Sequence, residues 1–139
     1  MRRLKRFMGL TTVERSLLFR ALFVVGTARM ALWSLPVAAA RRLVAAAAGV
    51  MDPAYADKSV WAVKVASRYI PRATCLTQAL AVQAMLARAG RDSRVEIGVA
   101  KEAGQFEAHA WVVCTDQILI GGPDVSRYSR LTTWASGNI

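Results

Sequence analysis

The hydrophobic pattern of this chain changes its period once, near residue 90, and this change limits the folds that the chain can adopt. Between residues 12 and 89 the apolar residues recur every three to four positions, which predicts helices. After Gly90, Val95, Ile97 and Val99 alternate with polar residues and a glycine, which predicts a strand. Helices followed by strands predict an α+β fold, with N-terminal helices and then a central helix packed on a small antiparallel sheet.

Capping residues and prolines divide the helical part into segments. Thr11 and Glu14 have the spacing of a capping box and predict a helix over residues 12–35, which Pro36 ends. Further helices are expected over residues 37–48, 57–69 and 75–89, the second with Asp57 as its N-cap and the third with Thr74. The side chain of Tyr69 is expected to face the core.

The strand part is predicted to form an antiparallel meander. Its first strand covers residues 95–99, and a loop follows over residues 101–105. Later strands are expected over residues 106–114 and 117–121, with a short last strand near residues 128–132. The two residues between the second and third strands, Thr115 and Asp116, form a tight turn.

Length and composition bound the class of protein. The chain has 139 residues, of which 55% are hydrophobic and 20% charged, so it has enough apolar surface to fold and is not mainly disordered. We expect a single domain over residues 1–139, with a helical part at 1–70 and a catalytic core at 71–139. One histidine and two cysteines exclude a four-ligand zinc site of the usual kind, and no metal or cofactor is predicted.

The net charge of +10 is concentrated near the N-terminus. Residues 1–50 carry nine Lys or Arg and one acid, whereas residues 51–139 carry ten and eight. Such a segment fits an anionic membrane, an acidic protein or nucleic acid, but no nucleic-acid-reading motif accompanies it, so nucleic acid is not predicted. We interpret the basic residues as the solvent edge of packed helices.

Uncharged runs in this region are short. They cover residues 21–28, 30–40 and 43–51, and none reaches the roughly 20 residues that cross a bilayer. Neither a spanning helix nor a cleaved signal is expected, and the chain is expected in the cytoplasm. A helix lying on a membrane surface is kept as an alternative but is not favoured.

One cysteine and the single histidine form a candidate catalytic pair. Cys75 is the first residue of a predicted helix, where unpaired N–H groups and the helix dipole stabilise a thiolate and can hold an oxyanion. His109 lies on a predicted strand and would act as general base and then as acid. The competing interpretation is structural, since single buried cysteines and histidines are common. Cys114, on the same strand, is expected to pack in the core.

An orienting carboxylate for His109 can be sought from the strand register. If Cys114 pairs with Gln117, then His109 lies opposite Gly122, and Asp124 projects from the same face one diagonal step away. A shift of one residue places His109 opposite Pro123 and turns Asp124 to the other face. Asp124 is therefore the predicted third residue, and Glu107 is the alternative.

Two motifs give the chain a resemblance to a known family. Cys75-Leu76-Thr77-Gln78-Ala79-Leu80-Ala81 with its continuation to Gly90, followed by Ile97-Gly98-Val99 and Ala108-His109-Ala110-Trp111-Val112, resembles the transglutaminase-like leader peptidases of lasso-peptide biosynthesis. The resemblance covers residues 72–131. The two motifs in this order and at this spacing are more specific than either alone.

The resemblance implies a papain-like cysteine peptidase that removes the leader from a ribosomally made precursor peptide. It implies Cys75 as nucleophile, His109 as general base, a separate small leader-recognition protein as partner, and an ATP-dependent cyclase that acts on the product. The family's acidic third residue is expected on the strand after the histidine, but here residues 118–122 contain no acid. Either Asp124 serves from beyond that strand, or the enzyme works as a dyad.

Two alternatives stay open at this stage. The same acyl-enzyme at Cys75 also serves a transglutaminase or an arylamine-type acyl transferase, where an amine replaces water as the acceptor. The missing acid also leaves room for an inert peptide-binding adaptor on the same fold.

Overall fold

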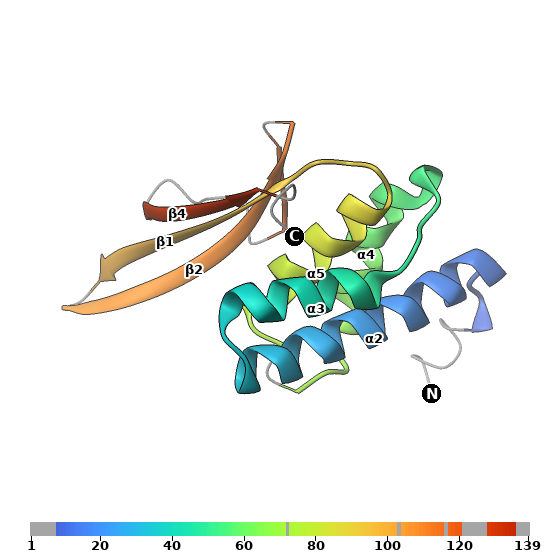
Figure 1. Cartoon of the computed structure of the whole chain (residues 1–139), viewed down its shortest axis with the longest axis horizontal. Coiled ribbons are helices and arrows are strands. Elements are labelled where there is room, and N and C mark those ends of the chain that lie inside the picture. The colour runs from blue at the N-terminus through green and yellow to red at the C-terminus, as the bar shows by residue number, and fades with distance from the viewer. Residues whose placement is uncertain (1–7, 72, 103, 116, 121–127, 136–139) are drawn as a thin grey trace.

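The computed structural model describes residues 8–71, 73–102, 104–115, 117–120 and 128–135. In this part of the chain four α-helices and a short 3-10 turn precede a four-stranded antiparallel sheet, which confirms the predicted α+β class (Figure 1). The helical elements are α2 (Thr12–Ser34), α3 (Val37–Ala48), η1 (Pro53–Tyr55), α4 (Ala56–Ala66) and α5 (Cys75–Arg88).

The long helix α2 begins as the sequence predicts. The Thr11 side chain accepts a hydrogen bond from the Glu14 N–H, and the Glu14 side chain accepts one from the Thr11 N–H, each at 3.1 Å. Its buried side chains pack against α3, α4 and α5. By length and composition this 23-residue helix is able to cross a membrane, although one face of it forms part of the core.

The predicted helix over residues 57–69 is present, but its predicted cap and its predicted end are wrong. Tyr55, not Asp57, holds the N-cap position of α4, and Asp57 lies within the first turn. The Asp52 side chain accepts from the Ala54 N–H and caps the preceding turn η1. The helix ends at Ala66, because the N–H groups of Arg68 and Tyr69 bond to carbonyls three residues back, in a tighter turn than that of an α-helix. Tyr69 therefore lies beyond the helix and is exposed, not in the core.

The strands are β1 (Arg94–Glu102), β2 (Gln105–Cys114), β3 (Gln117–Ile120) and β4 (Ser129–Ala135), and their order in the sheet is β3-β2-β1-β4. The predicted meander is therefore wrong for the last strand, because β4 pairs with β1 and not with β3. The predicted loop over residues 101–105 is also wrong. The β1–β2 ladder continues to the pair Glu102–Gln105, so the hairpin extends well away from the helices (Figure 1).

A buried polar network ties β4 to the helices. The Arg41 guanidinium of α3 donates to the Gln83 side chain of α5 at 3.2 Å and to the Ala135 carbonyl at 3.1 Å. It also lies 5.1 Å from the ring of Trp134. The Gln83 amide donates to the Trp134 carbonyl at 2.7 Å. Two central helices thereby hold the last strand against β1, which explains why β4 returns to that edge of the sheet.

Candidate functional site

The thiol of the predicted nucleophile lies at the start of the central helix. α5 begins at Cys75, as predicted, and Thr74 caps it by accepting from the Thr77 N–H at 3.3 Å. The Gln78 side chain, one turn on, donates to the Ala73 carbonyl at 3.0 Å and so holds the segment that leads into the helix. Cys75 is half-buried and packs against the core. These contacts fix the backbone around its sulfur.

His109 lies in an aromatic stack on the sheet. Its ring centroid is 6.2 Å from that of Trp111 and 5.2 Å from that of Tyr128, with interplanar angles of 28° and 27°. Trp111 shares a strand face with His109, as the alternation in the sequence predicts. Tyr128 comes from the segment just before β4, and sequence reasoning missed it because it offered no signal that this segment returns to β1.

The stack is supported by a buried carboxylate. Trp111 is 3% exposed, and its indole N–H donates to Glu96 at 2.8 Å. The other Glu96 oxygen accepts from the Arg130 guanidinium at 2.9 Å. A buried carboxylate is tolerated when both oxygens have donors, so Glu96 is satisfied and orients the indole that contacts His109. Glu96 sits at a polar position of an alternating strand, and no feature of the sequence indicated that it is buried.

Gly98 lies opposite His109 in the β1–β2 ladder. A Cβ atom at this position would come within 2.9 Å of both Trp111 Cη2 and Tyr128 Cβ, and within 3.0 Å of the Ser129 carbonyl oxygen. The Trp111 ring, the Tyr128 Cβ and the Ser129 carbonyl therefore fill the space that a side chain would need. The sequence signal for this close packing is a glycine inside an alternating strand.

The two predicted catalytic residues are carried by α5 and β2, elements that pack on each other. Along β2, Ala110 and Val112 belong to the core, so His109 and Trp111 lie on the other face of the sheet. Among the described residues no hydrogen bond joins the Cys75 thiol to the His109 imidazole. Their pairing in catalysis remains a prediction.

The β2–β3 register agrees with the prediction over its first pairs and then shifts. Cys114 pairs with Gln117 and Val113 with Ile118, but Val112 pairs with Ile120, one residue out of step. Gly122, Pro123 and Asp124 lie outside the described residues, so the predicted third residue is not located. Glu107, the alternative, lies on the same strand face as His109 and is exposed.

Cys114 is buried, which confirms its predicted place in the core, and its thiol contacts the Asp92 carbonyl at 3.4 Å. Both cysteines are free thiols. In the described part of the chain, no group of three or more His, Cys, Asp or Glu side chains is placed to hold a metal ion.

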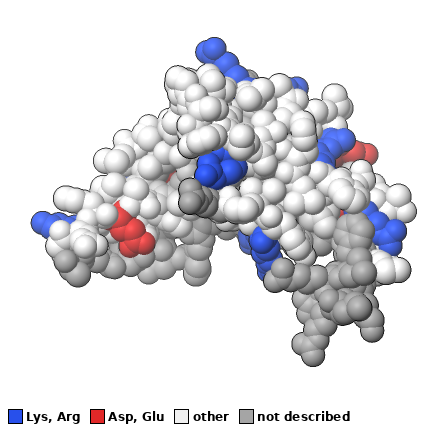
Figure 2. Space-filling view, turned by 90° about the horizontal axis from the view of Figure 1, so that it is seen from below, with Lys and Arg blue, Asp and Glu red and all other residues white. Residues whose placement is uncertain are grey.

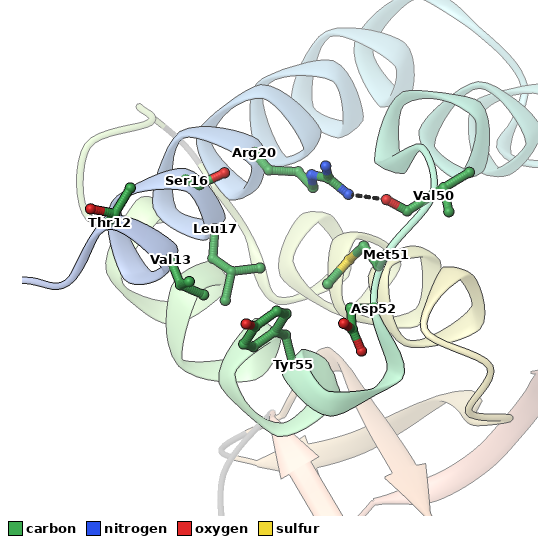
Figure 3. A pocket seen from close by; sticks show the side chains of 9 residues that line it. All are labelled: Thr12, Val13, Ser16, Leu17, Arg20, Val50, Met51, Asp52 and Tyr55. Atoms are coloured by element: carbon green, nitrogen blue, oxygen red, sulfur yellow. Dashed lines mark hydrogen bonds between the residues drawn. The ribbon is translucent and has the colours of Figure 1, made fainter.

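A cavity of about 380 Å³ lies apart from both predicted catalytic residues, between the first turns of α2 and the segment that leads into η1 (Figure 3). Leu17, Met51 and Tyr55 give it apolar walls. Arg20 reaches across its edge to donate to the Val50 carbonyl. This hydrogen bond joins α2 to the end of α3, so the cavity marks a helix junction.

A cysteine at the start of a central helix, packed on an antiparallel sheet that carries a histidine, defines a transglutaminase-like core. The model of the transglutaminase-like superfamily matches residues 21–133, and the chain belongs to this superfamily. The superfamily generally contains cysteine proteases and acyl transferases. No curated protein and no solved structure matches the chain.

Proposed function

We propose that this protein is a cysteine peptidase that removes the leader from a ribosomally made lasso-peptide precursor in the cytoplasm. The observation that carries the proposal is the position of Cys75, the first residue of the capped helix α5 in a transglutaminase-like domain. The motif around His109 on β2 supports it. The partners that we propose are the precursor peptide, a small leader-recognition protein and the cyclase that takes the product.

The first turn of α5 supplies the groups that acyl transfer needs. The N–H groups of Thr77 and Gln78 already bond to the side chain and carbonyl of Thr74. The N–H groups of Cys75 and Leu76 have no acceptor within a helix and are our candidates for the oxyanion hole. The helix N-terminus also favours a negative sulfur.

The chemistry would run in two steps. The Cys75 thiolate attacks the scissile carbonyl, the C–N bond breaks, and protonated His109 gives its proton to the leaving amine. Water, deprotonated by His109, then attacks the thioester and frees the leader carboxylate and the thiol. Both steps require the imidazole within hydrogen-bond reach of the sulfur or the water, so His109, which lies on the sheet face away from the core, must approach Cys75 when substrate binds. Asp124, or Glu107 in its place, would orient the imidazole.

The test is cleavage of a synthetic precursor peptide, with and without a leader-recognition protein, followed by mass spectrometry. Cys75→Ala should abolish cleavage and also remove the acyl-enzyme adduct, whereas Cys114→Ala, a matched control at the buried thiol, should leave cleavage intact. Cleavage by Cys75→Ala at the rate of the unmodified protein would overturn the proposal.

The histidine and the acceptor are tested in the same assay. His109→Gln should slow the release of the leader by about 100-fold or more, the usual scale for a general base. Reactions with and without hydroxylamine, an added amine, identify the group that attacks the acyl-enzyme. A peptidase uses water and therefore releases a leader carboxylate even when hydroxylamine is absent. Transfer to an added amine with no hydrolysis would instead indicate an acyl transferase and contradict the peptidase assignment.

A further inference from the structure

The helix α2 exposes large apolar side chains on the face that points away from the core. Phe19 is 60% exposed, Phe23 63%, Met30 59% and Trp33 74%. At 100° per residue these four positions fall within one stripe along the helix, opposite the face that packs in the core. A surface helix normally carries polar residues on its outer face, so this helix is apolar on two sides.

A shallow apolar groove widens this stripe. The groove has a volume of about 510 Å³, and α2 and α3 form it together. Phe23 and Met30 lie along it, and the half-exposed Leu35 and Leu43 form its far side. Single exposed apolar residues are ordinary, but a continuous apolar area of this kind marks a surface that binds something.

Basic residues accompany the stripe. Helical geometry places Arg29 on one flank and Arg15 at the edge of the stripe on the same side, whereas Arg20, on the other side, donates to the Val50 carbonyl. The only acid of α2, Glu14, is engaged in the cap with Thr11. The whole segment of residues 1–50 carries nine basic residues and one acid. Figure 2 views the molecule from the side on which α2 lies in Figure 1, and basic side chains there are separated by wide uncharged areas.

We propose that this face of α2 docks on the surface of an anionic lipid membrane, with the helix lying in the plane of the interface. Phe19, Phe23, Met30 and Trp33 would enter the boundary between headgroups and acyl chains. Arg29 and the other basic residues of the first 50 would extend to lipid phosphates. The length and apolar composition of α2, which are those of a helix able to cross a membrane, favour lipid over a protein partner.

The same geometry argues against a spanning helix. The opposite face of α2 contributes four side chains to the core, those of Leu17, Ala21, Val25 and Ala28. Insertion of α2 across a bilayer would remove them and expose the faces of α3, α4 and α5 that pack against α2. An interfacial position buries the outer stripe and keeps the core intact. The membrane-surface alternative, which the sequence did not favour, is therefore the one that the exposed face supports.

The experiment is co-sedimentation of the full chain with vesicles of phosphatidylcholine, alone or with about one quarter phosphatidylglycerol. We expect binding to the anionic vesicles, weaker binding to the neutral ones, and release as salt shortens the Debye length. The double variant Phe23→Ser/Trp33→Ser should bind the anionic vesicles about tenfold less or weaker still. Phe106→Ser is the matched control, because Phe106 is 75% exposed on the distant hairpin.

Circular dichroism establishes that each variant is folded, and the residues changed are exposed, so folding should survive. Binding of the double variant equal to that of the unmodified chain would overturn the proposal, as would absence of binding to anionic vesicles. A concentration-dependent dimer that disappears in the double variant, with no vesicle binding, would instead assign the face to a second copy. Cys75→Ala should bind as the unmodified chain does, which separates this test from that of the peptidase.

Discussion

The indole of Trp111 and the carboxylate of Glu96 are direct cross-strand partners, and a 2.8 Å hydrogen bond joins them in the buried part of the β1–β2 ladder. The other carboxylate oxygen accepts from Arg130, so β1, β2 and β4 meet at one acid. His109 stacks on the same indole. The position of the predicted base therefore depends on a carboxylate that does not touch it.

Loss of this hydrogen bond should destabilise the sheet. Trp111→Phe removes the donor and leaves one oxygen of a buried carboxylate unpaired, so we expect the free energy of unfolding to fall by about 1–3 kcal/mol. Glu96→Gln and the double variant complete a mutant cycle, measured by urea denaturation. A coupling energy of about 1 kcal/mol is expected. Strict additivity of the two single effects would show that the pair is not coupled.

Gly98 should not tolerate a methyl group. Gly98→Ala places a Cβ within 2.9 Å of Trp111 and Tyr128, so it should lower the free energy of unfolding by about 1–3 kcal/mol and slow precursor cleavage. Gly26→Ala is the control, because Gly26 lies within α2 and the nearest side-chain atom to its new Cβ would be 4.0 Å away. This variant should be neutral or stabilise the fold by up to about 1 kcal/mol. Equal stability of the two variants in thermal denaturation would contradict the packing argument.

The Gln83 amide should be needed for the attachment of β4. Gln83→Leu removes one of the two acceptors of the buried Arg41 guanidinium and the donor to the Trp134 carbonyl, at a cost of about 2 kcal/mol in unfolding free energy. Amide hydrogen exchange should rise first in β4 and spare α2. Uniform exchange through the whole chain would mean that the network does not act on β4 in particular.

The cap of α2 should be sensitive to acid. Hydrogen bonds from the backbone N–H and the side chain of Thr11 hold the pKa of Glu14 below its ordinary value, and Lys58 adds to this shift. Because the folded pKa is the lower one, this carboxylate stabilises the fold above its unfolded pKa, and the contribution is lost as pH falls through the folded value. NMR titration should show Thr11→Ala raising the pKa part of the way, since the backbone donor remains. No change in that variant would exclude the side-chain contribution.

Local signals predicted much of this molecule. The capping box of Thr11 and Glu14, and Thr74 ahead of Cys75, located helix starts correctly because caps act over three or four residues. Alternation correctly placed His109 and Trp111 on one strand face. The error at Asp57 arose where two short elements with different caps follow each other, and the error at Tyr69 arose where the last turn of α4 tightens. Periodicity resolves neither feature.

The amino-acid order alone determined the helix–strand division, the position of Cys75 at a helix start and the excess of positive charge in the first third of the chain, since these follow from neighbours in sequence. Tertiary structure decided which edge of the sheet receives β4, which acid becomes buried beside Trp111, and which face of α2 remains uncovered. Each of these depends on contacts between segments far apart in the chain, such as Arg41 with Ala135, and such contacts form only when the whole fold closes.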